Sequence, residues 1–306
     1  MIAARRKIRH GRSWTAIALL ATAFPLLTGC ASMVVSKRKL PLPVAPPTVQ
    51  TASADELVAR INEQWASFQS LTATVDIQAS KLKSQEGIAT DYPSFRGNLL
   101  LRKPEMLRIL GKMPVVQTTM FDLASDGTRF TLLVPPRSKV YQGLNAARGK
   151  SPNWYENLRP GFLFSAMVVR GLAPDELYSV ISESITEEDA AKKRLLIRPE
   201  YVLNIVRRKP GGQELAPVRV IRFHREDLLP YEQDLYDENG NLETQVLYGP
   251  YEDFGGSKFP STITLKRPQD EYQLLMTVER IMANPGLSDD QFQVKIPNGS
   301  TIQVLQ

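Results

Sequence analysis

Residues that could support covalent or metal chemistry are few in this chain. Its 306 residues include one cysteine, Cys30, and two histidines, His10 and His224. Nucleophilic triads and common zinc sites need several such side chains together. There is no glycine-rich phosphate-binding pattern, and the Pro-Gly-Gly-Gln stretch at 210–213 is typical of a loop. The sequence therefore predicts no metal, no cofactor and no catalysis based on His or Cys.

Carboxylates are the remaining candidates for catalysis or metal binding. Acidic residues cluster at 187–189 and at 289–290, and such runs are typical of solvated surfaces and helix starts. Asp234, Asp237 and Glu238 surround an Asn-Gly turn but lack the spacing and the final glutamate of a calcium loop. We therefore expect no enzyme. A hydrolase that uses only Asp, Glu or Lys is the alternative.

The surroundings of Cys30 indicate a different kind of chemistry. A basic stretch at 5–12 precedes an apolar run at 14–27, and Leu-Thr-Gly at 27–29 stands directly before Cys30. This order is typical of a secretory leader. The apolar run is shorter than the roughly 20 residues that cross a bilayer. A cysteine of the core that happens to follow a leader is the alternative.

The pattern before Cys30 resembles the lipobox of bacterial lipoproteins. The resemblance implies cleavage after residue 29 and a diacylglyceryl group with an added acyl chain on Cys30, which would anchor the chain stably in a membrane. In enteric bacteria an aspartate at the next position favours the inner membrane. Ala31 occupies it here, so we expect the outer membrane, with the chain facing the periplasm, rather than the inner one.

The formal charge of +6 is concentrated near the N-terminus. Basic residues at 5–12 and 37–39 have no acidic neighbours, and after residue 50 the two signs nearly balance. Nucleic-acid binding needs a basic surface on the folded part, so none is expected. We predict a leader at 1–29, a lipidated cysteine with a proline-rich tether at 30–52, and a single domain at 53–306.

Periodicity predicts one N-terminal helix followed by many strands. Ser53 and Glu56 form a capping-box pattern, and apolar residues at helical spacing predict a helix over 54–69. Alternating segments then predict about eleven short antiparallel strands, with hairpins at Asp126-Gly127 and Asn239-Gly240. An apolar segment near 162–169 predicts a second helix. Together these indicate a large curved sheet that the helical segments cover.

The segment Gly-Lys-Met-Pro-Val-Val-Gln at 111–117 has an unusual composition for a turn. Gly111 and Pro114 mark a turn between two strands, yet Met113, Val115 and Val116 are apolar, whereas turns are usually polar. A neighbouring loop could bury this tip. The alternative is a tip that contacts a membrane or a bound cargo.

The whole pattern of elements resembles the bacterial lipoprotein-localisation carriers, LolA and LolB. The segments that carry the resemblance are Leu-Thr-Ala-Thr-Val-Asp-Ile at 71–77, Arg-Lys-Pro-Glu-Met at 102–106, the apolar helix at 158–174 and Phe-Pro-Ser-Thr-Ile at 259–263. The resemblance implies an all-β fold with helices, a half-open antiparallel β-barrel with an α-helical lid. It also implies an apolar cavity for acyl chains. The chain is longer than these carriers, with extra loops near 81–94, 144–158 and 208–216.

The resemblance also implies roles for particular residues. Met113, Pro114, Val115 and Val116 match a protruding loop of the outer-membrane acceptor that helps to deliver cargo. Lys103 matches an arginine that holds the lid shut in the soluble carrier, although lysine lacks the planar guanidinium fork. The residues expected to line the cavity are Leu99, Leu101, Leu107, Ile109, Phe121, Leu123, Phe162, Leu163, Ala166 and Met167.

The resemblance therefore implies a membrane-anchored lipoprotein that binds acyl chains of lipoproteins or other lipids. It would take part in their transfer to, or placement in, the outer membrane, with a soluble periplasmic carrier as a further partner. The alternative is an envelope interaction or sensor lipoprotein with the same fold, a packed interior and no lipid cargo.

Overall fold

The computed structural model describes residues 44–46, 48–83, 87–145, 160–189 and 194–305. The chain divides into two compact units, Met1–Val44 with Glu188–Leu195, and Ala45–Glu187 with Leu196–Gln306. Cys30, the leader and most of the tether lie outside the described residues, and the single domain at 53–306 stays a prediction.

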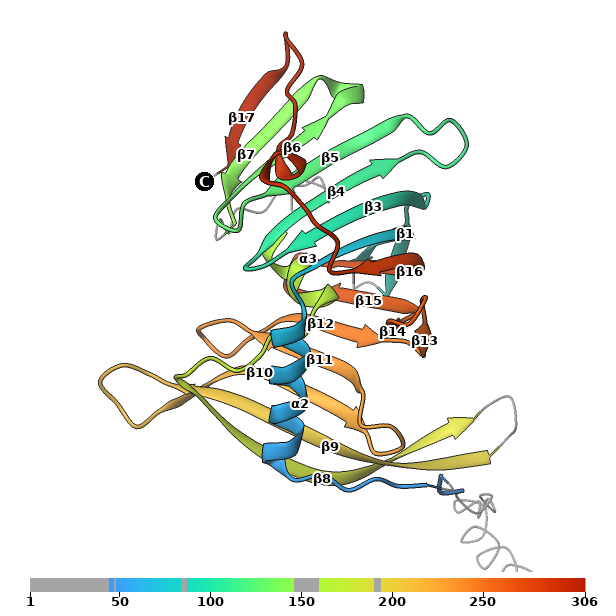
Figure 1. Ribbon diagram of the computed structural model, residues 1–306, viewed down its shortest axis with the longest axis vertical. Helices are drawn as coiled ribbons and strands as arrows, with labels where there is room; N and C mark the ends of the chain where they lie inside the picture. The colour runs from blue at the N-terminus through green and yellow to red at the C-terminus, as the bar shows by residue number, and fades with distance from the viewer. Residues whose placement is uncertain (1–43, 47, 84–86, 146–159, 190–193, 306) are drawn as a thin grey trace, which may run out of the picture. The chain divides into compact units, whose positions relative to one another are not determined.

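The helices and strands are numbered as in Figure 1. They are α2 (Ala54–Ser67), β1 (Ser70–Lys83), β2 (Ile88–Asp91), β3 (Phe95–Arg102), β4 (Met106–Lys112), β5 (Thr119–Ser125), β6 (Arg129–Val134), η2 (Pro135–Arg137), β7 (Lys139–Leu144), α3 (Pro160–Met167), β8 (Glu176–Asp189), β9 (Arg194–Arg208), β10 (Leu215–His224), β11 (Pro230–Tyr236), β12 (Leu242–Tyr248), β13 (Tyr251–Asp253), β14 (Lys258–Pro260), β15 (Thr262–Arg267), η4 (Pro268–Asp270), β16 (Tyr272–Ala283), η5 (Asp289–Phe292) and β17 (Thr301–Leu305).

One large sheet contains most of the described strands (Figure 1). Its order is β17-β7-β6-β5-β4-β3-β1-β16-β15-β12-β11-β10-β9-β8, β2 pairs with the end of β1, and β13 and β14 form a separate pair. Neighbours are antiparallel wherever their register is described, except that β17 runs parallel to β7. The two ends of the order do not pair. The predicted open antiparallel sheet with helices is therefore confirmed.

In the described part of the chain the sheet has 15 strands, more than the roughly eleven expected from periodicity. The strands that periodicity missed are β2, β7 and β17, which have four, six and five residues and give little alternation to detect. Proline is rare inside strands, yet Pro199 lies within β9. The chain passes through it as the single strand β9, and the carbonyl of Pro199 still accepts a hydrogen bond from the Arg225 N–H, at 3.1 Å.

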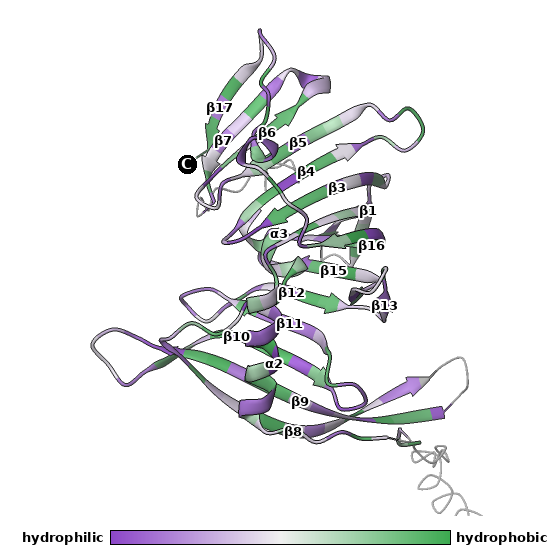
Figure 2. Ribbon diagram, in the orientation of Figure 1, coloured by the Kyte–Doolittle hydropathy of each residue, from purple (hydrophilic) through white to green (hydrophobic). Residues whose placement is uncertain are grey.

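Alternating side chains of the strands form the core. In β3 and β4, Leu99, Leu101, Leu107 and Ile109 are buried, while the residues between them are only partly buried. Figure 2 shows this interspersion of hydrophobic and polar residues along the strands, and a largely hydrophobic α3. Burial of one strand face favours the observed register, because a shift by one residue would expose the whole set.

The chain after β16 packs on the other side of the same strands. Arg102 and Arg108 alternate with the buried leucines, so they point away from the core. Arg102 Nη1 donates to the carbonyl of Leu287 (2.6 Å), and Arg108 Nη1 donates to that of Gln291 (2.9 Å). Phe292 is buried beneath the Arg102 guanidinium. The sheet is thus covered on both faces at β3 and β4.

Candidate functional site

Helix α2 begins where the sequence predicted. The Glu56 N–H donates to Ser53 Oγ at 3.2 Å, and the Ser53 N–H donates to Glu56 Oε2 at 2.7 Å. The bond from the Ser53 backbone holds the pKa of Glu56 below its ordinary value. The helix ends at Ser67 rather than Gln69, and it buries Leu57, Val58 and Ile61 in the core.

Two aromatic residues near the end of α2 contact α3. Trp65 stacks with Phe68 (centroids 6.0 Å apart), and both rings meet Phe164 of α3 edge-on, at 6.4 and 6.3 Å. We call Trp65, Phe68 and Phe164 the aromatic junction. Edge-on contacts are worth about 0.5–1.5 kcal/mol beyond burial. The junction therefore joins the two helices.

Helix α3 lies against the core as a cover. Phe162, Leu163, Phe164, Ala166 and Met167 are buried, so the helix is apolar on nearly all sides. It contacts β4, β5 and β15, which come from distant parts of the sheet order. A helix that is apolar all round must be enclosed by other elements or by a ligand.

All residues expected to line a cavity belong to one buried cluster. The cluster contains Leu99, Leu101, Leu107, Ile109, Phe121, Leu123, Phe162, Leu163, Ala166 and Met167. The fold thus brings together strands β3–β5 and helix α3, as expected. Only Met167 of this set lines either of the two pockets described next. Their role as a ligand surface stays a prediction.

Two pockets flank the junction of the helices. One, of about 300 Å³, has a mixed lining that includes Trp65, Pro104, Phe164 and Arg170. The other, of about 210 Å³, lies between the helix ends and the sheet, and its lining includes Phe68, Leu71, Met167, Tyr248, Phe259 and Ile281. Val168 lines both. Phe164 of α3 lines the first pocket and Met167 of α3 the second, so movement of α3 would change both.

Lys103 contacts the end of α2. Its Nζ donates to the carbonyl of Trp65 and lies 4.3 Å from the centre of the Trp65 ring. A cation there stabilises the helix C-terminus and the ring face together. Partial burial lowers the pKa of Lys103. Lys103 thus contacts α2, and its role as a lid latch stays a prediction.

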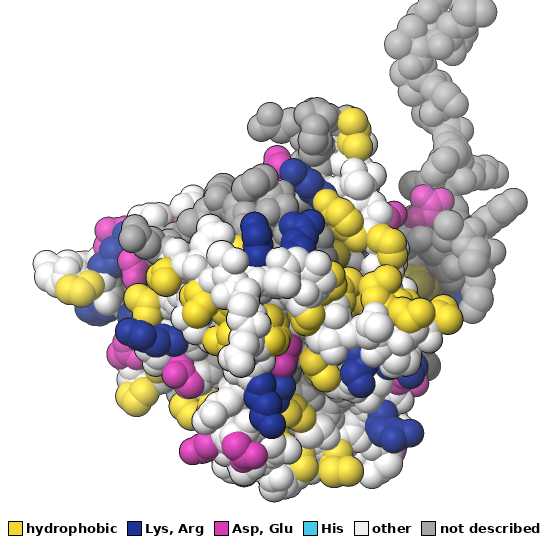
Figure 3. Space-filling view, turned by 90° about the horizontal axis from the view of Figure 1, so that it is seen from above, with side chains coloured by type: hydrophobic (Ala, Val, Ile, Leu, Met, Phe, Trp, Pro, Cys, Tyr) yellow, Lys and Arg dark blue, Asp and Glu magenta, His cyan; other side chains and the backbone are white. Residues whose placement is uncertain are grey.

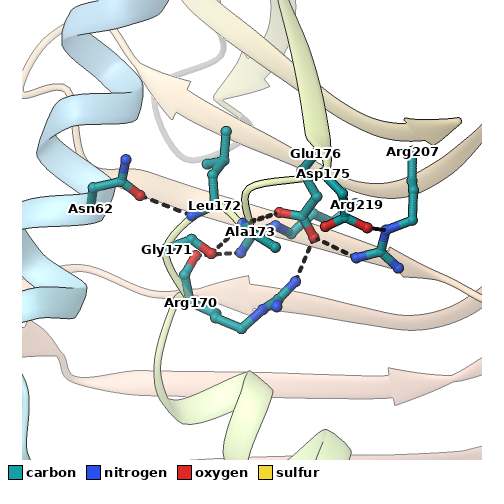
Figure 4. A network of polar contacts seen from close by, with 9 residues as sticks. All are labelled: Asn62, Arg170, Gly171, Leu172, Ala173, Asp175, Glu176, Arg207 and Arg219. Atoms are coloured by element: carbon teal, nitrogen blue, oxygen red, sulfur yellow. Dashed lines mark hydrogen bonds and ion pairs between the residues drawn. The ribbon is translucent and has the colours of Figure 1, made fainter.

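A buried ionic network fixes the segment that follows α3 (Figure 4). Arg219 is almost fully buried, and its guanidinium donates to the carbonyls of Arg170 and Gly171 and lies 3.5 Å from Glu176. Burial lowers the pKa of Arg219 to about 10. The Glu176 carboxylate also accepts from Arg170 Nη2 (2.6 Å) and from the Ala173 N–H (2.9 Å). The segment from 170 to 176 is thereby held at several points.

This segment is also tied to α2 and β9. Asn62 Oδ1 of α2 accepts from the Leu172 N–H at 2.9 Å. Arg207 of β9 pairs with Asp175 at 2.6 Å and with Glu176 at 3.4 Å (Figure 4). The network was missed from the sequence. The available signal was Arg219 itself, since it continues the odd-numbered positions that Ile221 and Phe223 bury in β10.

The hairpin between β4 and β5 exposes its apolar tip. Val115 is 94% exposed, Val116 66% and Met113 38%. The turn closes on itself, because Gln117 donates from its N–H to the carbonyl of Met113 (3.1 Å) and from Nε2 to that of Pro114 (2.8 Å). No described residue covers the tip.

Gly111 was expected in the turn, but it lies within β4. It faces Phe121, whose ring occupies the space that a Cβ at Gly111 would need, at 2.6 Å. This glycine is required by close packing in the strand pair, and the tip is shorter than the sequence suggested.

The described residues contain no group of His, Cys, Asp and Glu side chains that could hold a metal ion. No helix among them is long and apolar enough to cross a membrane. On the face drawn in Figure 3, hydrophobic side chains lie among both basic and acidic ones.

No family model and no curated protein matches the chain. Several solved structures are similar to it. A LolA superfamily protein from Nitrosomonas europaea has a TM-score of 0.47 and 13% identity, over 80% of this chain and 99% of that one. A DUF1329 family protein from Desulfovibrio piger has a TM-score of 0.48 and 16% identity, over 78% of this chain and 95% of that one. A putative outer membrane lipoprotein-sorting protein domain from Vibrio parahaemolyticus has a TM-score of 0.46 and 12% identity, over 78% of this chain and 94% of that one.

The likeness is one of fold alone. Members of the superfamily named from the sequence are thus among the structures that the chain resembles. The identity and the TM-score are too low to indicate its ligand.

Proposed function

We propose that this chain binds acyl chains of lipoproteins or other lipids between helices α2 and α3 and the sheet. It would take part in their transfer to, or placement in, the outer membrane. The observation that carries the proposal is the apolar pocket between the helix ends and the sheet, with Phe68, Leu71 and Met167 in its lining. Most of the walls are aliphatic and aromatic, which suits a hydrocarbon ligand, and Gln64, Ser67, Ser257, Lys258 and Asn284 add polar groups to the lining.

The energetics favour such a ligand without any energy source. Each CH₂ transferred from water into an apolar site contributes about 0.8 kcal/mol. The pocket of about 210 Å³ takes part of an acyl chain, and movement of the largely apolar α3 would admit more. Release then needs only a tighter site or an adjacent bilayer.

Two further features support membrane contact. Cys30 follows a leader with a lipobox pattern, which would tether the chain to the membrane through its proline-rich segment. The tip at Val115 and Val116 presents aliphatic side chains to solvent. We propose that this tip dips into the bilayer or contacts the cargo during transfer.

A substitution that fills both pockets tests the proposal. Val168→Trp adds bulk at the residue that the two pockets share. We expect the variant to take up a fluorescent fatty acid at least about tenfold more weakly than the unchanged chain, with an unchanged far-UV spectrum. Val304→Trp, at an exposed position of β17, is the matched control and should bind the probe normally. Equal uptake by both variants would refute binding at this site.

A second candidate function is an envelope interaction protein without cargo. The observation that favours it is the burial of all the predicted lining residues in one hydrophobic cluster, as in a packed interior. Failure of the unchanged chain to take up the fatty acid, together with stoichiometric recovery of one protein partner, would support this candidate over the carrier.

A further inference from the structure

Strand β8 ends the order of the sheet, and one of its edges has no partner strand among the described residues. It pairs with β9 on one side. Over residues 177–187, no backbone hydrogen bond joins its other edge to any described residue. The N–H and C=O groups of such an edge can pair with another extended chain.

This edge lacks the usual protection against pairing. Edge strands are normally shielded by lysine, proline or a bulge. Residues 177–187 contain neither lysine nor proline, and Leu177 and Ile181 are 47% and 52% exposed. An exposed edge of this length, with aliphatic side chains at some positions, is suited to receive a partner strand.

The side chains of β8 define what would pair there. The Tyr178 hydroxyl donates to Asp55 of α2 at 2.7 Å, so even-numbered residues face the helix side. The opposite face carries three aliphatic residues and two glutamates, in the order Leu177, Ile181, Glu183, Ile185 and Glu187.

Both glutamates are about half exposed, and their ion pairs with Arg222 (3.4 Å) and Arg198 (2.9 Å) are therefore weak. Arg222 is also shared with Glu200 and Glu232. The edge is thus aliphatic and acidic on one face.

We propose that β8 docks an extended segment of another protein, antiparallel to residues 177–187, with aliphatic and Lys or Arg side chains on one face. Main-chain bonds supply affinity, and pairs across the strands supply specificity. A second copy of this chain fits less well, because its β8 would bring acidic residues and no basic one to face Glu183 and Glu187. This inference goes beyond lipid binding and does not depend on it.

A designed peptide tests the docking on the full chain. Lys-Thr-Val-Thr-Lys-Thr-Val-Thr-Ser-Thr-Val places lysines opposite Glu187 and Glu183 and valines opposite Ile185, Ile181 and Leu177. The control peptide replaces both lysines by glutamate. By fluorescence anisotropy, we expect the lysine peptide to bind at least about tenfold more tightly than the control, with an affinity that falls as salt is added.

Two controls separate strand pairing from simple charge attraction. Ile181→Lys should weaken the lysine peptide by about tenfold. Met282→Lys, at an exposed position of the interior strand β16, should leave its affinity unchanged. Methylation of the backbone nitrogens that point to one edge of the peptide should also abolish binding, because it removes the N–H donors that would pair with β8. Equal binding to Ile181→Lys, equal binding of the N-methylated peptide, or a dimer of the chain that Ile181→Lys dissociates would each overturn the proposal.

Discussion

Among single residues, Val115 and Lys103 are suited to mutational tests, because neither side chain is part of the hydrophobic core. Val115 lies almost wholly in water, so its side chain contributes little to folding. Lys103 is a cation set against the end of a helix and an indole ring. The two residues therefore allow function and stability to be tested separately.

Val115→Asp should impair membrane contact and leave the fold intact. An exposed position away from caps and buried groups changes stability by less than about 0.5 kcal/mol. A carboxylate at the tip resists entry into a bilayer, so we expect Val115→Asp, combined with Cys30→Ser to prevent lipidation, to lose the binding to lipid vesicles that Cys30→Ser alone shows in co-sedimentation.

Val304→Asp, at another exposed apolar site, is the control and should sediment with vesicles as before. Unfolding of Val115→Asp would mean that the tip is part of the core, and unchanged sedimentation would exclude a role in membrane contact.

Lys103→Met should destabilise the chain by about 1 kcal/mol, because it removes the ammonium from the Trp65 ring and from the last turn of α2. Urea unfolding measures this loss. Lys295→Met, at an exposed position, should leave the free energy of unfolding unchanged. A Lys103 variant as stable as the Lys295 variant would show that the contact with α2 contributes nothing.

Features of single residues could be predicted where they depend only on residues nearby in the sequence. The apolar tip and the capping box of Ser53 involve residues a few positions apart. The contact of Lys103 with Trp65 and the network around Arg219 join distant segments, and nothing local specifies them. A buried arginine also contradicts the ordinary preference of charged residues for the surface, so the alternation alone could not identify it.

At the scale of elements, the connection between α2 and the segment after α3 determines how firmly the cover is held. Asn62 and Trp65 of α2 both lie against Gly171. A Cβ at Gly171 would stand 2.8 Å from Trp65 Cδ1 and 3.0 Å from Asn62 Oδ1. Close approach of these elements therefore requires glycine.

Gly171→Ala should destabilise the chain by about 1–3 kcal/mol, because Trp65 must shift to make room. Gly161→Ala, in α3 with nothing near its Cβ position, should cost nothing and can add up to about 1 kcal/mol through helix propensity. Thermal unfolding of both variants makes the comparison. Equal melting temperatures of the two variants would show that close packing of Gly171 against Trp65 and Asn62 is not needed for stability.

Long alternating strands and the capped helix were predictable because period and cap are properties of the chain itself. The pairing of β17 with β7 was not, since five residues that follow a turn at Gly299 give no sign of a parallel partner some 160 positions earlier. Alternation within each strand allowed the lining residues to be placed on one face. The pockets around Val168 lie between segments that are distant in the sequence, so they could not be predicted from it.

At the scale of the whole molecule, the chain combines a wide open sheet, an apolar cover and a predicted lipid anchor. The described residues hold no group of side chains that could bind a metal ion. The proposed function requires the space beneath α2 and α3 to hold hydrocarbon.

Native mass spectrometry of the full chain, released gently from the cells that express it, tests that claim most directly. We expect a population whose mass exceeds that of the chain by one acyl-bearing lipid, bound without a covalent link and lost on denaturation. Val168→Trp should reduce this population. A single species at the mass of the chain alone, with the same result after incubation with lipid, would contradict the account.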